Sequence, residues 1–355
     1  MTEQELTQDA ISLLKKLIET QSFSSEEDVT ASHIEDWFKR YDIDFKRTLN
    51  NVWAVNKYFD DSKPTLLLNS HHDTVKPNNA YTRNPLKADV EDGKLYGLGS
   101  NDAGGCLVSL MATFTHFYNQ KDLKYNLVIV ASAEEESSGS NGLNSMLPII
   151  PKIDVAIVGE PTLMNLAVAE KGLVVFDAVI EGTPSHAAHP NDNNAIYNTI
   201  EVLQWFKDLK FEKSSEALGD VKLTVTQINA GKQHNVVPAD VKLVIDVRVN
   251  DAYSNAEIAE FLQENAPCTN ITPRSLRLNS SSIPVDHDLV KAGISMGRTT
   301  YGSPTLSDQA VLSCPSLKLG PGDSTRSHSA DEFIYVNEIE EGVKIYIELL
   351  NRVIV

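Results

Sequence analysis

The sequence is poor in cysteine and contains no long apolar run. Its three cysteines, Cys106, Cys268 and Cys314, are widely scattered and form no CxxC pair. This excludes a disulfide-stapled secreted domain and fits a reducing compartment, so we expect a cytoplasmic protein. No apolar stretch approaches the ~20 residues of a membrane-spanning helix. The first residues, MTEQELTQDAISLLKKLIET, have the pattern of an acidic amphipathic helix and not of a signal peptide.

Positive charge is also scarce. The chain has 49 acidic residues against 31 basic ones, which gives a formal net charge of -18. A surface this acidic repels phosphate backbones and anionic lipid heads, so we expect neither a nucleic-acid partner nor a membrane partner. The 355 residues, 41% of them hydrophobic, suffice for two ordinary domains or for one large domain with an insertion.

Short segments that are apolar at every position mark the first half of the chain. Such segments are typical of strands buried on both faces, as in an α/β layer fold. We therefore predict a domain with helices on both faces of a mostly parallel sheet. The segments are 52–55, 66–68, 127–130 and 155–158, and a further buried-strand segment follows the alternating region at 316–319.

A different pattern begins near Val174. Residues 240–248 are apolar at every second position, which favours an antiparallel sheet with one wet face. Helical segments at about 194–207 and 255–265 lie between such strands, in the order strand, helix, strand, strand, helix, strand of a split βαβ unit.

The alternating pattern ends near Ser282, and a last helix is predicted at about 338–352 with Asn337 as its N-cap. We therefore predict that a small domain, 174–281, is inserted into a larger one made of 1–173 and 282–355.

Polar residues follow several of the predicted buried strands or lie in the loops beside them. In a parallel sheet the carboxyl ends of the strands share one edge, so these residues can converge although they are distant in sequence. Each motif alone is common in ordinary loops. The residues concerned are His71, Asp102, the run Glu134–Glu136, Glu160 and His328.

Charge restricts what such a cluster can hold. Several carboxylates crowded together do not all stay ionised without a cation. Two divalent ions balance three carboxylates and one bridging hydroxide, and neutral imidazoles complete the coordination. Because the ligands are nitrogen and oxygen only, we predict two Zn²⁺ per subunit, with Co²⁺ or Mn²⁺ as possible substitutes. The glutamate run then has an acid left to serve as a general base.

The motifs in chain order resemble a known family. They are SHHDTV, DGKLYGLGSNDAGG, SAEEES, VGEPT and LGPGDSTRSHSADE. Together they are similar to the boxes of the dinuclear-zinc deacylase and carboxypeptidase family, which includes acetylornithine deacetylase, succinyl-diaminopimelate desuccinylase and aminoacylases. The resemblance implies a zinc-peptidase-like catalytic domain, 1–173 with 282–355, and a ferredoxin-like lid and dimerisation domain, 174–281.

The resemblance also implies roles for single residues. Glu135 would be the general base, Asp73 would orient His71 by a hydrogen bond, and the peptide bond Asp102–Ala103 would be cis. The metal ligands would be His71 and Glu160 on one ion, Glu136 and His328 on the other, and Asp102 bridging both.

In the inserted domain the stretch EGTPSH resembles the lid-histidine box of the family. His186 would donate a hydrogen bond to the oxyanion, from one subunit of a homodimer into the site of its partner. Asn235, in HNVVP, would help to bind substrate. Arg248 lies on the polar side of its strand, where its guanidinium could pair with a substrate carboxylate.

One motif departs from the family pattern, because Ala103-Gly104-Gly105 stands where the family usually has Met-Lys-Gly. The ligand is kept, but the packing of this loop cannot be inferred by analogy.

The resemblance predicts a metal-dependent amidohydrolase with a small N-acyl amino acid as substrate. The closest match, including Ala169-Glu170-Lys171-Gly172, is to acetylornithine deacetylase. This predicts removal of an acetyl or succinyl group from an ornithine- or citrulline-type amino acid in arginine biosynthesis. The alternatives are a succinyl-diaminopimelate desuccinylase and a dipeptidase or carboxypeptidase. A non-catalytic binding protein is disfavoured because Glu135 and every ligand are present.

Overall fold

The computed structural model describes residues 2–355, which form two compact units. The larger unit comprises residues 2–168, Ser282–Tyr301 and Ser307–Val355, and the inserted unit comprises Ala169–Ser281 with Gly302–Leu306. The inserted unit therefore begins a few residues before position 174. The alternating pattern that marks it becomes visible only inside its first strand, β9 (Gly172–Glu181).

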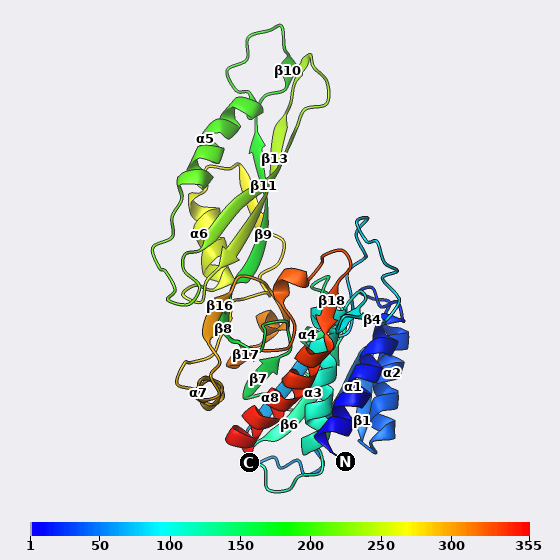
Figure 1. Cartoon of the computed structure of the whole chain (residues 1–355). Helices are drawn as coiled ribbons and strands as arrows, with labels where there is room; N and C mark the ends of the chain where they lie inside the picture. The colour runs from blue at the N-terminus through cyan, green and yellow to red at the C-terminus, as the bar shows by residue number, and fades with distance from the viewer. Residues whose placement is uncertain (1) are drawn as a thin grey trace. The chain divides into compact units, whose positions relative to one another are not determined.

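Four parallel strands form the centre of the main sheet in the larger unit (Figure 1). All their residues are buried, because helices or loops cover both faces. In spatial order they are β6 (Asn126–Ser132), β3 (Thr65–His71), β7 (Val155–Val158) and β17 (Ser316–Lys318).

Antiparallel strands flank this parallel centre, so the sheet as a whole is mixed. On one side β2 pairs antiparallel with β6 and with β1, and on the other side β8 pairs antiparallel with β17. The outer strands are β1 (Phe45–Thr48), β2 (Asn51–Val55), β8 (Leu166–Glu170), β15 (Ser281–Ser282) and β16 (Thr300–Ser303). The predicted α/β class with a parallel core is confirmed.

Helices α1 (Glu3–Ile18), α3 (Gly105–Phe117) and α8 (Val336–Ile354) pack against one another beside the sheet (Figure 1). The predicted start of α8 was wrong, because Tyr335 and not Asn337 is its N-cap. Strand β18 (Phe333–Tyr335) runs directly into the helix, and the backbone N–H of Tyr335 donates to Glu338 at 2.9 Å. None of the helices in residues 2–355 has the length and apolar character that a bilayer crossing requires.

The remaining short elements lie around this core. Strand β18 pairs with β5, and β5 pairs with β4, in a separate three-stranded sheet. These surrounding elements include α2 (Asp28–Arg40), β4 (Asp89–Glu91), β5 (Lys94–Tyr96), α4 (Leu143–Met146) and α7 (Asp288–Ser295).

The inserted unit is a four-stranded antiparallel sheet with both helices on one face (Figure 1). Alternate residues of its central strands, such as Phe176 and Ile245, are buried against α5 and α6 in one apolar cluster. The predicted order of strands and helices is present, with a small added hairpin of β10 and β12. Its elements are β9, β10 (Ser185–His186), α5 (Ala195–Asp208), β11 (Lys222–Ala230), β12 (Val236–Val237), β13 (Asp240–Val249), α6 (Asn255–Asn265) and β14 (Asn270–Pro273).

Candidate metal centre

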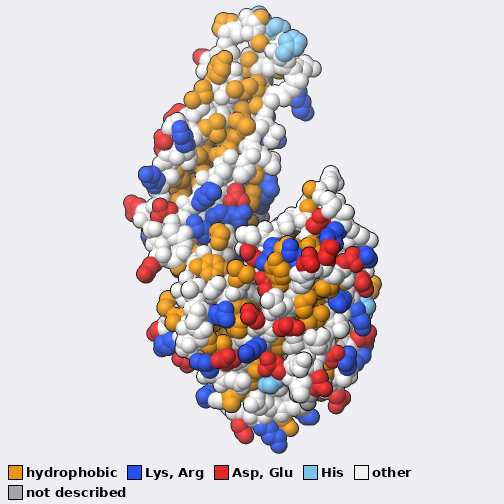
Figure 2. Space-filling model, viewed as in Figure 1, with side chains coloured by type: hydrophobic (Ala, Val, Ile, Leu, Met, Phe, Trp, Pro, Cys, Tyr) orange, Lys and Arg blue, Asp and Glu red, His pale blue; other side chains and the backbone are white. Residues whose placement is uncertain are grey.

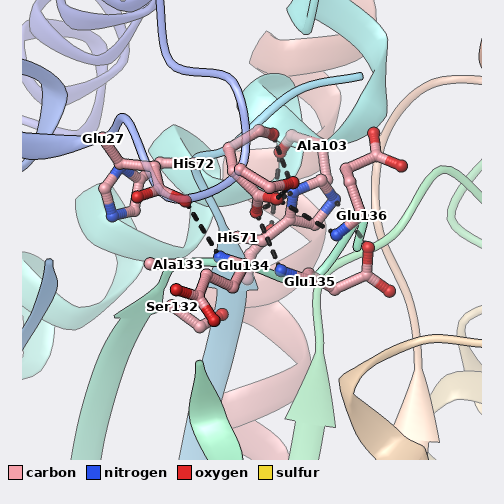
Figure 3. A network of polar contacts seen from close by, with 12 residues as sticks. Glu27, His71, His72, Ala103, Ser132, Ala133, Glu134, Glu135 and Glu136 are labelled. Atoms are coloured by element: carbon pink, nitrogen blue, oxygen red, sulfur yellow. Dashed lines mark hydrogen bonds and ion pairs between the residues drawn. The ribbon is translucent and has the colours of Figure 1, made fainter. Parts of the chain in front are cut away.

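The carboxyl ends of the central strands bring the polar residues of the larger unit together. His71 is the last residue of β3, the Glu134–Glu136 run follows β6, and Glu160 follows β7. The loop that carries Glu134, Glu135 and Glu136 runs beside His71 (Figure 3). Because β3, β6 and β7 are parallel neighbours, the fold itself gathers these groups at one edge.

Asp102 reaches the same edge from the turn that enters α3. This turn is a distorted helical segment, Ser100–Gly104, and the peptide bond Asp102–Ala103 is cis, as the resemblance implied. A Cβ on Gly104 would lie 2.5 Å from the backbone oxygen of Gly99 and 2.6 Å from Leu14 Cδ1. The loop is therefore packed around glycine, and the lysine usual at this position in the family would not fit without a shift of the backbone.

His71 is the most buried member of the cluster, with 1% of its side chain exposed. Its Nδ1 lies 3.0 Å from the backbone oxygen of Asp73, which accepts the Nδ1–H. This leaves Nε2 deprotonated in the neutral ring, with no hydrogen-bond partner among residues 2–355. Nε2 faces three carboxylates, at 3.4 Å from Asp102, 3.7 Å from Glu160 and 3.9 Å from Glu135.

His328 approaches the cluster from the opposite side of Asp102. Its Nε2 lies 2.9 Å from Glu136 Oε2 and 3.6 Å from Asp102 Oδ2, whereas His71 faces Asp102 Oδ1. The two oxygens of Asp102 therefore each face a different histidine. A carboxylate placed in this way is suited to bridging two cations.

The donor set fits divalent cations. Ligand atoms of His71, Asp102 and Glu136 lie within 4.8 Å of one another, as do those of His71, Glu135 and Glu160. An unpartnered imidazole nitrogen surrounded by carboxylate oxygens, with no thiolate, matches the ligand chemistry of zinc and similar metals.

The pKa values of the cluster also indicate a site for positive charge. Burial and the charge of Asp102 raise the pKa of Glu160 to about 8. The hydrogen bond with Glu136 raises the pKa of His328 to about 9. Burial opposes protonation of His71, but Asp102 and Asp73 outweigh it and raise the pKa of His71 well above its usual range. The crowded carboxylates of this cluster therefore favour positive charge beside them, which is what bound divalent ions supply.

Asp73 supports the cluster in two ways. Its carboxylate lies 3.3 Å from His71 Nδ1, and it accepts hydrogen bonds from the backbone N–H groups of Glu135 at 3.0 Å and Glu136 at 3.1 Å. Ser24 Oγ donates to it at 2.7 Å. Asp73 therefore fixes the ring of one predicted ligand and the backbone of another. The sequence pattern carried no signal for this second contact.

The first glutamate of the run supports the loop instead of facing the cluster. Glu134 has φ +55°, and its carboxylate accepts from the backbone N–H of Asn141 at 3.1 Å and from Ser25 Oγ at 3.0 Å. Buried Glu27 accepts from the N–H of Glu134 at 3.1 Å (Figure 3). His72 is buried too, and its ring nitrogens lie 2.9 Å from Thr30 Oγ1 and 2.9 Å from the backbone oxygen of Asn50.

The other predicted site residues lie in the inserted unit. His186 is exposed on β10, and its Nδ1 accepts from the N–H of Ala188 at 3.1 Å, which leaves Nε2–H as the donor of the neutral ring. Asn235 lies beside this hairpin, since its backbone oxygen accepts from the N–H of Ala187 at 3.0 Å. Arg248 is paired with Asp246 through two hydrogen bonds, at 2.9 and 3.2 Å, so its guanidinium is already engaged.

A parallel-sheet edge that gathers histidines and carboxylates in this way is the arrangement of a metal-dependent hydrolase of amide bonds. The chain belongs to the peptidase family M20/M25/M40, whose family model matches residues 67–352. It is 29% identical to the succinyl-diaminopimelate desuccinylase of Rickettsia felis, over 97% of this chain and 100% of that protein. It is 26% identical to the enzyme of the same name from Rickettsia bellii, over 95% of each chain.

Solved structures share the fold. An M20 metallo-carboxypeptidase from Sulfolobus solfataricus superposes with a TM-score of 0.76 at 16% identity, covering 97% of this chain and 99% of the other. A dinuclear metal-binding M20 peptidase from Bacillus subtilis superposes with a TM-score of 0.74 at 15% identity, covering 98% of each chain. At these identities the likeness concerns the fold alone.

Proposed function

We propose that this protein is a metal-dependent deacylase of small N-acyl amino acids, with an N-succinyl-diaminopimelate type of substrate as the first candidate. The observation that carries the proposal is the buried, unpartnered Nε2 of His71 facing Asp102, Glu135 and Glu160. In the neutral ring this nitrogen is a lone-pair donor surrounded by carboxylate oxygens, which is the arrangement that a bound cation requires.

Two divalent ions, zinc being the best match to the donor set, would be held as the resemblance implied. His71 and Glu160 would hold one ion, Glu136 and His328 the other, and Asp102 both. When bound, such ions supply a nucleophile at neutral pH and polarise the amide carbonyl.

The residues of the chain would do the rest of the chemistry. Glu135, 13% exposed at the edge of the cluster, would take a proton from the attacking water and return it to the leaving nitrogen. Asp73 would keep the His71 ring in its productive tautomer. His186 would donate its Nε2–H to the developing oxyanion.

The choice between acyl groups rests on two different observations. The names of the curated relatives favour a succinyl group on diaminopimelate. The motif resemblance favours N-acetylornithine and a role in arginine biosynthesis. Both substrates present an amide next to a carboxylate, so the same metal chemistry serves either one.

We expect the chelator-treated protein to be inactive and to recover turnover when two equivalents of zinc are restored. The restored enzyme should hydrolyse N-succinyl-diaminopimelate faster than N-acetylornithine, N-acetylcitrulline or their succinyl counterparts, as measured by release of the free amine. The reverse order would assign the chain to acetylornithine deacetylation. Turnover of dipeptides alone would show a peptidase and contradict the deacylase proposal.

We also propose that the protein is a homodimer joined through the inserted unit. Helix α5 exposes Tyr197 and Ile200, at 69% and 67% of their surface, and apolar side chains cover this part of the unit in Figure 2. The edge strand β11 lies next to α5 and exposes Ile228 at 56%. An apolar helix face beside an open strand edge is suited to pairing with a second copy.

Tyr197→Asp combined with Ile200→Asp is therefore expected to convert a dimer into a monomer, as measured by size-exclusion chromatography with light scattering. Charges on this face would have to be desolvated in the interface. A wild-type protein that is monomeric at micromolar concentration would contradict the proposal.

A further inference from the structure

One buried carboxylate outside the predicted ligand set holds the turn that carries Asp102. Glu332 is 2% exposed. Its Oε1 accepts from the backbone N–H groups of Asn101 at 2.8 Å and Asp102 at 3.0 Å, and its Oε2 accepts from that of Gly99 at 3.1 Å. Three backbone donors therefore converge on a single side chain.

The backbone of Glu332 is itself fixed in place. Its carbonyl oxygen accepts from the N–H of Gly97 at 3.0 Å, directly before β18, which pairs with β5. Strand β18 also contacts the turn at Ser100–Gly104. The side chain thus extends from the residue before a hydrogen-bonded strand into the distorted helical turn of Asp102.

The same C-terminal loop supplies His328. Asn101 adds a second link between the two segments. Its side chain accepts from the backbone N–H of Asp323 at 3.0 Å and donates to the backbone oxygen of Asp323 at 3.1 Å. Glu332 and Asn101 therefore connect the turn of Asp102 to the loop of His328. The spacing between these two ligand residues depends on this connection.

We propose that Glu332 is a positioning residue that orients Asp102 toward both cations, an inference that rests on the proposed metal centre. The two oxygens of Asp102 face His71 at 3.4 Å and His328 at 3.6 Å, so a rotation of the turn would move one of them away from its histidine. Glu332 touches neither cation nor substrate in this arrangement. It acts through the backbone amides that precede the Asp102 side chain.

The test is Glu332→Gln, which keeps the size of the side chain but replaces one accepting oxygen with an NH₂ group that cannot accept. Zinc affinity, measured by competition with a chromophoric chelator, is expected to weaken about 10- to 100-fold, as for other residues that orient metal ligands. At saturating zinc, kcat should fall while KM changes little. Glu332→Asp keeps both oxygens on a shorter side chain and should bind zinc with intermediate affinity.

Asp154→Asn is the matched control. Asp154 accepts a backbone N–H, that of Thr65 at 2.9 Å, at the opposite end of β3 from His71. It should lose stability without losing zinc affinity. Wild-type zinc affinity in Glu332→Gln would overturn this inference alone. A wild-type chain that binds no zinc would overturn the metal centre and this inference together.

Discussion

Glu135→Gln is expected to lower kcat by about 10²- to 10⁴-fold, the range that a positioned general base contributes. The amide keeps the shape of the side chain but cannot accept a proton. Glu135 is 13% exposed, and its carboxylate lies 3.9 Å from His71 Nε2. Burial and the charge of Glu160 raise the pKa of Glu135 well above its usual range.

The zinc content of the variants distinguishes a general base from a metal ligand. Glu135→Gln should still bind two zinc ions per chain, measured by elemental analysis after gel filtration. Glu136→Gln, one residue further on, should lose zinc, because Glu136 lies 2.9 Å from His328 Nε2 and shares the cluster with Asp102. Near-wild-type turnover by Glu135→Gln, or loss of zinc from it, would show that the two glutamates have been given the wrong roles.

The sequence predicted the part of the site that depends on strand order. Apolar segments such as 66–68 and 127–130 are signals of strands buried on both faces, and parallel strands must end at one edge. Because His71 and Glu136 follow two such strands, their proximity follows from topology without any knowledge of side-chain contacts. The same reasoning covers Glu160, which follows β7.

The supporting contacts could not be predicted in this way. The bonds from Glu332 and Asp73 run to backbone N–H groups of residues far along the chain, and backbone groups leave no trace in the sequence. The glycine at position 104 could not be explained from the sequence either. Only the packing of Gly99 and Leu14 around it shows why no side chain is present.

The strands of the inserted unit leave a clear signal in the sequence, whereas its ends do not. The period of two in β13 is a strong signal, since Val241 and Leu243 are buried while Lys242 between them is exposed. Its first residues belong to β8, which is buried at every position and therefore resembles the larger unit. The boundary at Ala169 lies inside β8, so no change in amino-acid composition marks it.

Asp102→Asn is expected to weaken zinc binding by more than about 10²-fold, beyond the loss typical of residues that only orient a ligand. The amide preserves the volume of the side chain but removes the negative charge from the position between the two histidines. At a zinc concentration 100 times the wild-type Kd, binding stabilises the wild-type fold by about 2.7 kcal/mol, whereas the variant would gain only about 0.4 kcal/mol.

The two proteins should therefore differ most in how their melting temperature responds to zinc, with a large rise for the wild type and almost none for Asp102→Asn. Asp154→Asn should respond like the wild type, because Asp154 lies at the start of β3 and its carboxylate contacts Thr65. If Asp102→Asn gained as much stability from zinc as the wild type does, Asp102 would not be a ligand. The orientation of its two oxygens toward His71 and His328 would then contribute only to the stability of the metal-free fold.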